Sequence, residues 1–120
     1  MSQHRIYIIL TYVSSHDEAM HIVNTLLDET LIACANIAPS VESHYTWKNQ
    51  KCVETETPIW IKTTASQLEA AKHRLRALHP YETPALIDWP VNTNSDYTTW
   101  AYATTSPVKD TSKGLHTQQP

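Results

Sequence analysis

The pattern of hydrophobic positions opens with a strand and a helix. Arg5 to Val13 is a near-continuous run rich in Ile, Tyr and Val, which is typical of a buried strand. Ser15 and Glu18 then have the spacing of a capping box. The apolar residues that follow recur at helical intervals, which predicts an amphipathic helix from Ser15 to about Glu29; they are Ala19, Ile22, Val23 and Leu26.

After Leu31 the apolar pattern changes to a period of two. Two strand segments follow, 31–38 and 41–48, with Pro39 between them. An unbroken strand over both would reach about 60 Å at 3.3 Å per residue. A domain of this size has a radius of gyration of only about 13 Å. We therefore expect the ribbon to bend at Pro39, to protrude, or both.

The chain is predicted to reverse direction at 48–51. In this segment Asn49 is the residue best able to adopt a positive φ without glycine. The return strand is expected from Val53 to Thr63, and Pro58 within it indicates an edge strand or a bulge.

A second helix and two short elements complete the pattern. Ser66 and Glu69 are spaced as another capping box, and the helix is expected to end before Pro80. A short strand is expected at 85–91, followed by a last short helix with Asn94 or Ser95 as its cap. The apolar stripes of the two helices comprise Leu68, Ala71, Leu75 and Leu78, and Tyr97, Trp100, Ala101 and Thr104.

The order strand, helix, strand, strand, helix, strand is that of the split βαβ sandwich. It predicts an α+β, ferredoxin-like fold, βαββαβ plus a short C-terminal helix, in one domain over residues 1–104. Residues 105–120 are expected to form a flexible tail, because they contain few large apolar residues.

Composition narrows the functional classes. The 120 residues carry a formal charge of −3 with no basic stripe, which argues against nucleic-acid binding. No apolar run approaches the ~18 residues that a membrane span requires, and we expect a cytoplasmic protein with free thiols. The only glycine is Gly114, so a P-loop, a dinucleotide-binding turn, a nucleophile elbow and the anion loop of an acylphosphatase cannot be built before it.

Five segments resemble the CutA family of divalent-cation tolerance proteins, in order and spacing over about residues 5–104. They are LIACANIAP at 31–39, SHYTWK at 43–48, Glu56 with WIKT at 60–63, HPYETP at 79–84 and DYTTW at 96–100. The resemblance implies a tight homotrimer of P-II-like shape, with long strands pairing between neighbours. It also implies a role in tolerance to copper and other divalent metals, with no established enzymatic reaction and no obligatory cofactor.

Four residues are candidate metal ligands. His79 could bind copper or another divalent metal through its imidazole, with Glu82 three residues away; alternatively, His79 caps the helix that ends there. The family places a carboxylate at Glu56, which could instead form an ion pair across the sheet or a subunit boundary. Cys34 is a soft ligand if its thiol is accessible, but its small apolar neighbours favour a buried, inert thiol.

Two positions depart from the family pattern. Some bacterial members use a Cys at the end of the first strand and a His before the His-Pro pair as copper ligands, together with the strand carboxylate. This chain has Thr11 and Leu78 there, and neither can replace a thiolate or an imidazole toward copper. Asn49 likewise stands where a tight-turn glycine is usual.

Aromatic residues are expected to line a cleft between subunits or to pack at the interface itself. Lys62 could hold an anion there or form a surface salt bridge. The aromatic candidates are Tyr45, Trp47, Tyr81, Tyr97 and Trp100. Two hypotheses follow: a non-enzymatic trimer that binds metal or a small ligand at subunit boundaries, or an intracellular signalling or scaffold trimer that acts through a protein partner.

Overall fold

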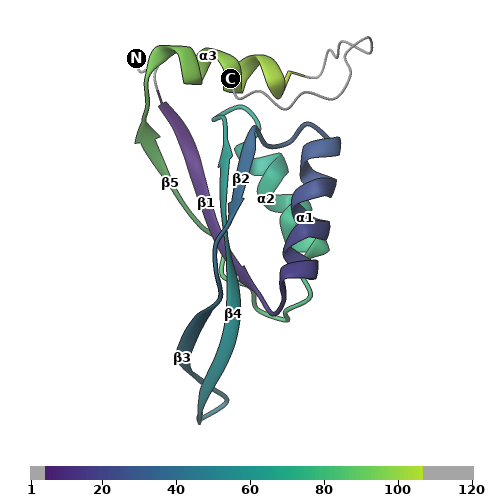
Figure 1. The fold of residues 1–120 in the computed structure, drawn as a ribbon, viewed down its shortest axis with the longest axis vertical. Helices are drawn as coiled ribbons and strands as arrows, with labels where there is room; N and C mark the ends of the chain where they lie inside the picture. Colours follow the sequence, from purple (N-terminus) through teal and green to yellow (C-terminus); the bar gives the residue numbers. More distant parts are fainter. Residues whose placement is uncertain (1–4, 107–120) are drawn as a thin grey trace.

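The computed structural model describes residues 5–106, and all eight elements belong to one antiparallel sheet and its helices (Figure 1). The strands and helices are β1 (Arg5–Val13), α1 (His16–Asp28), β2 (Cys34–Ile37), β3 (Val41–Trp47), β4 (Gln50–Thr63), α2 (Leu68–Leu78), β5 (Ile87–Asn92) and α3 (Ser95–Thr104).

The sheet has the strand order β2-β4-β1-β5, and β3 pairs with the outer half of β4. Helices α1 and α2 lie side by side on one face of the sheet, whereas α3 crosses one end of it (Figure 1). This arrangement confirms the ferredoxin-like expectation. It also separates the molecule into a body, an α3 end and a projecting β3–β4 hairpin.

The core lies between the sheet and α1 and α2. Ile9, Ile59 and Ile61 alternate toward the helices and are fully buried, as are Leu26 and Leu75 on the helices. Burial of each such side chain contributes about 1.5–3 kcal/mol. The residues between them on β1 and β4 point to the opposite face of the sheet. Of the helices within residues 5–106, α3 is the one that packs there, at one end.

The ribbon after Leu31 both bends and protrudes, as its length predicted. Pro39 lies between β2 and β3, and the β3–β4 hairpin extends beyond the helices (Figure 1). The resulting radius of gyration is 15.5 Å, above the ~13 Å of a compact domain of this size.

The hairpin turns on two residues, Lys48 (φ 50°) and Asn49 (φ 67°). Two consecutive positive φ angles are the geometry of a type I′ hairpin turn. The positive φ expected at Asn49 is therefore confirmed. The turn is shorter than the predicted 48–51, and β4 begins at Gln50 rather than at Val53.

Pro58 occupies an inner strand, so the prediction of an edge strand is wrong, but the pairing beside it shifts by one residue between Ile37↔Ile59 and Val41↔Glu56, as at a bulge. Pro58 lies opposite Tyr12 of β1, while its carbonyl accepts a 3.0 Å hydrogen bond from Ala38 N–H. The N–H and C=O of a residue in an antiparallel strand point to the same neighbour. The donor that proline lacks therefore faces the break between β2 and β3, and the β1–β4 ladder loses nothing.

The helix caps follow the sequence only in part. Ser15 Oγ accepts from Glu18 N–H at 3.1 Å, but the Glu18 carboxylate accepts from Ser14 rather than from Ser15. At α2 the capping-box prediction is wrong, because Ser66 Oγ pairs with Thr64 Oγ1 and the N-cap is Gln67. Asn94 is the N-cap of α3, without a side-chain cap bond.

Thr105, the first residue of the predicted tail, packs against the domain. Thr105 is 2% exposed, its hydroxyl donates to Ala101 O, and its carbonyl accepts from Gln67 Nε2. Thr105 therefore joins α3 to the start of α2. Ser106 N–H donates to Ala103 O at 3.3 Å, and residues 107–120 of the predicted tail lie outside the described residues. Among the helices described, none is long and apolar enough to cross a bilayer.

Candidate functional site

A cavity of about 670 Å³ lies at the base of the projecting hairpin; we call it the hairpin cavity. Strand β1, the hairpin and the segment between α2 and β5 form its walls. Its lining comprises Tyr12, Ser14, Ser43, His44, Tyr45, Trp47, Glu54, Glu56, Tyr81, Glu82, Thr83 and Ala85. Three carboxylates and four aromatic phenol or indole rings are in this set, and lysine and arginine are not.

The hairpin register brings the carboxylates of β4 to this wall. Glu54 and Glu56 are two residues apart and therefore lie on one face of β4, opposite Ser43 and Val41 of β3. Tyr45 lies on the same face. Its pKa is raised, first by partial burial and then by the negative charges around it, of which Glu54 is the strongest.

Tyr81 fixes the position of Glu56. Its hydroxyl donates a 2.7 Å hydrogen bond to Glu56 Oε2. Burial raises the pKa of the Tyr81 phenol well above its usual range, and the hydrogen bond to the negatively charged Glu56 raises it further. The phenol therefore stays protonated and continues to donate.

Behind Tyr81, His79 is buried and uses both ring nitrogens within the chain. Nδ1 accepts from Tyr81 N–H at 3.2 Å, so the neutral ring carries its proton on Nε2. Nε2 lies 2.9 Å from the Tyr12 carbonyl and 3.1 Å from Thr11 Oγ1. Burial lowers the pKa of His79, which keeps the ring neutral. His79 is thus a structural residue that holds Tyr81 against β1, and its lone pair is not available to a metal.

The four predicted metal ligands do not form one group. Glu56 and Glu82 line the hairpin cavity, and His79 lies behind it. Cys34 is paired with Lys62, six residues from Glu56 along β4 and hence about 20 Å away. Across residues 5–106 no three His, Cys, Asp or Glu side chains are grouped to hold a metal ion.

The predicted aromatic cleft is likewise divided between two places. Trp47 and Tyr81 line the hairpin cavity, whereas Tyr97 and Trp100 pack at the α3 end, with ring centroids 5.3 Å apart.

Lys62 Nζ lies 6.0 Å from the centroid of the Tyr97 ring. Burial, followed by the neighbouring Cys34, raises the pKa of Tyr97 to about 12. Cys34 itself is half-buried, not fully buried as its neighbours suggested.

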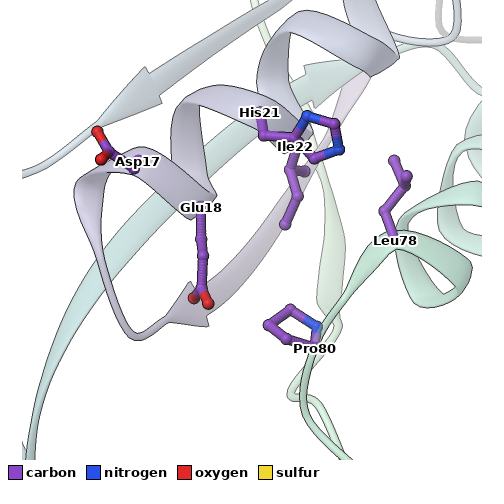
Figure 2. A pocket seen from close by; sticks show the side chains of 6 residues that line it. All are labelled: Asp17, Glu18, His21, Ile22, Leu78 and Pro80. Carbon is purple, nitrogen blue, oxygen red and sulfur yellow. The ribbon is translucent and has the colours of Figure 1, made fainter.

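A smaller cavity of about 280 Å³ separates the start of α1 from the end of α2 (Figure 2). Asp17, Glu18 and His21 from α1 line it together with Leu78 and Pro80 from the other side. In Figure 2 the carboxylate of Asp17 points away from the His21 ring. Glu18 is held by Ser14, so the polar groups do not converge on one point.

Sequence reasoning missed Tyr12, Ser14, Ser43 and Glu54 as members of the hairpin cavity. The signal for Glu54 was present, because it shares a strand face with Glu56. Ser43 could not be identified in the same way, because its partner on β4 depends on the length of the turn. A two-residue turn at 48–49 places Ser43 opposite Glu54, and the longer turn expected at 48–51 does not give that pairing.

A family model described as "CutA1 divalent ion tolerance protein" matches residues 7–104. The chain belongs to the CutA1 family. The divalent-cation tolerance protein CutA of Pyrococcus horikoshii is 36% identical over 94 residues, which are 78% of this chain and 91% of that protein. The CutA of Thermus thermophilus is 34% identical over the same shares.

Solved CutA1 structures share the fold. The CutA of Synechococcus elongatus PCC7942 superposes with a TM-score of 0.82 at 28% identity, covering 88% of this chain and 95% of that one. The divalent ion tolerance protein CutA1 of Ehrlichia chaffeensis gives a TM-score of 0.80 at 36% identity, covering 84% and 95%. The family assignment and the ferredoxin-like fold are thus established together.

This CutA1 chain is built differently at the two positions where some relatives are expected to carry copper ligands. Thr11 is fully buried and contacts His79 Nε2, so it is part of the structural network behind the cavity. Leu78 lines the smaller cavity and packs against the core. The side chains present do not fit a soft copper site within one subunit.

Proposed function

We propose that this CutA1-family protein is a non-enzymatic, cytoplasmic homotrimer that takes part in the response to divalent cations. In this proposal it binds a cation or a small ligand in the hairpin cavity, at a subunit boundary. The family assignment supports the link to divalent cations. Because copper would lack its soft ligands here, the proposal does not rest on a resident copper ion or any other obligatory cofactor.

One observation carries the proposal that the hairpin cavity binds a cation or a small ligand. Glu54, Glu56 and Glu82 line a single cavity that no lysine or arginine of residues 5–106 enters. Their negative charges therefore remain uncompensated inside a concave surface, where the field of like charges is strongest. Such a surface attracts cations and repels anions, whatever the identity of the ligand.

The face of the sheet opposite α1 and α2 supports the proposal that the protein is a trimer. On the face opposite α1 and α2, the side chains of Leu10, Trp60, Ile87 and Trp89 form what we call the open face. Trp60 is 39% exposed and Ile87 is 49% exposed. A monomeric protein rarely leaves large apolar side chains contiguous on its surface, and contact with further copies would bury them.

Light scattering and calorimetry together test the proposal. We expect a mass near three times 13.7 kDa at micromolar concentration. Titrations with Mg²⁺, Cu(II) and Cu(I) are then compared between the wild type, Glu56→Gln and Glu69→Gln. The last variant removes the same charge from exposed α2, away from the cavity.

Saturable cation binding that Glu56→Gln weakens and Glu69→Gln does not would support the proposal. A monomeric mass would overturn the trimeric part. An intact trimer that binds no cation or small molecule would instead favour the signalling or scaffold hypothesis, in which the readout is a protein partner.

A further inference from the structure

We propose that the hairpin cavity binds a small organic cation, one that carries an ammonium group on an apolar body. This inference rests on the proposed function, because it names the ligand class for the same cavity. It goes further in preferring an organic ammonium ion to a bare metal ion, and the walls of the cavity supply the reasons.

The size of the cavity favours a molecule over an ion. Its volume of about 670 Å³ falls in the range of small-molecule sites, about 300–1,000 Å³. A metal ion needs several donors within about 2–2.6 Å of one point. In the part of the chain that the structure describes, no such trio of acidic, His or Cys side chains exists. The carboxylates line one space without converging.

The aromatic walls favour a cation with apolar substituents. Tyr12, Tyr45, Trp47 and Tyr81 all line the cavity, and three of them are tyrosines that also offer hydroxyl groups. The face of an aromatic ring attracts an ammonium ion, and the same ring packs well against a hydrocarbon. A hydrated metal ion would gain little from these rings.

The carboxylates are placed to accept from ammonium N–H groups. Tyr81 occupies only Oε2 of Glu56, and neither Glu54 nor Glu82 forms an ion pair within residues 5–106. The imidazole of His44, which also lines the cavity, lies 2.8 Å from the carboxylate of Glu42, which does not line it. A charge-assisted hydrogen bond to a carboxylate is stronger than one between neutral groups. Among the described residues of one chain, the cavity thus has free acceptors and no lysine or arginine in its lining.

The network behind the wall holds this surface in place before any ligand arrives. His79 fixes the backbone of Tyr81, and Tyr81 fixes Glu56 on β4. A ligand that binds to a preformed wall does not have to order it. This arrangement favours a defined small molecule over a diffuse layer of counterions.

The test compares benzylammonium with benzyl alcohol by calorimetry on the full chain in its assembled state at pH 7.5. The two probes share a ring and differ in charge. We expect saturable benzylammonium binding, at least about tenfold tighter than that of the alcohol. Glu56→Gln should weaken it about five- to tenfold while keeping an acceptor for Tyr81, and Glu69→Gln should leave it unchanged.

Glu54→Gln, on an exposed stretch of β4, provides a second variant should Glu56→Gln fold poorly, and the same loss is expected. Equal affinity for the two probes would overturn the inference, since the cavity would then be merely apolar. Equal effects of Glu56→Gln and Glu69→Gln would overturn it as well, because the attraction would be non-specific.

The metal titrations separate this inference from the proposed function. If Mg²⁺ or copper binds in a Glu56-dependent manner and benzylammonium does not, the inference fails and the proposed function stands. If an intact trimer binds neither metal nor benzylammonium, both statements about the ligand fail.

Discussion

The hydroxyl of Tyr81 donates a 2.7 Å hydrogen bond to Oε2 of Glu56, across 25 residues of sequence. This bond joins the segment after α2 to the root of the projecting hairpin. It also orients one carboxylate of the hairpin cavity, whose lining contains no lysine or arginine of residues 5–106. The stability of the hairpin root and the charge of the cavity therefore depend on the same pair of residues.

Removal of the Tyr81 hydroxyl should destabilise the fold. Tyr81→Phe loses a hydrogen bond to a charged acceptor and leaves Glu56 partly buried without it, for a cost of about 1–2 kcal/mol. The measurement is the urea midpoint at a fixed protomer concentration. Tyr102→Phe, on the exposed side of α3, is the matched control and should change stability by less than about 0.5 kcal/mol. Equal effects of the two substitutions would show that the Tyr81–Glu56 bond contributes nothing.

Stability should fall in mild acid because of His79. Burial lowers its pKa in the folded chain, despite the opposing pull of the Tyr12 carbonyl and the charges of Glu18 and Glu56. Below the unfolded pKa of about 6.5, the unfolded chain therefore binds more protons than the folded one, and stability is lost as the pH falls. In structural terms, a second ring proton on Nδ1 would face Tyr81 N–H.

Urea midpoints measured between pH 8 and pH 5 check this. His79→Gln should flatten the dependence on pH in the acid range, whatever it does to the absolute stability. His73→Gln, on exposed α2, should leave the wild-type slope intact. A wild-type slope in His79→Gln would assign the acid sensitivity to other groups.

The hairpin turn should tolerate glycine. Lys48 and Asn49 both have positive φ, a geometry that glycine adopts without steric cost. We expect Asn49→Gly to be neutral or to stabilise by up to about 1 kcal/mol, and Asn49→Ala to destabilise by about 1 kcal/mol. Lys48 is left in place in both variants, because its ammonium lies 5.7 Å from the Trp47 ring centroid. A loss of more than about 1 kcal/mol in Asn49→Gly would contradict this account.

Local sequence patterns were sufficient for the order of the elements and for the projecting hairpin. Strand β1, helix α1 and the bend at Pro39 each follow from periodicity, capping residues or length. The edge-strand alternative for Pro58 was wrong because a proline is normally excluded from an inner strand. Pro58 is tolerated here only because another proline, Pro39, interrupts the neighbouring ribbon at the same level. The alignment of Pro39 with Pro58 depends on how the two strands pair, which the pattern of residues along one strand does not encode.

The site was predicted in part for a similar reason. The sequence indicated Glu56 and Glu82 as metal ligands and Trp47 and Tyr81 as cleft or interface aromatics, in two separate groups, whereas all four line one cavity in the structure. The separation of Lys62 from Glu56 follows directly from their spacing on a long strand. The contact of His79 with β1 could not be predicted, because its partners Thr11 and Tyr12 are 68 and 67 residues away.

A charge on the open face should dissociate the proposed trimer. Trp60 lies beside Trp89, with ring centroids 6.1 Å apart, on the face that α1 and α2 leave uncovered. Trp60→Glu would place a carboxylate in a contact that is apolar when copies assemble, and burying an unpaired charge is strongly unfavourable. Light scattering should then show the mass falling from a trimer toward 13.7 kDa. Tyr102→Glu adds the same charge at an exposed position of α3 and should leave the mass unchanged. A Trp60→Glu trimer as stable as the wild type would mean that the subunits associate through other surfaces and that the open face has another partner.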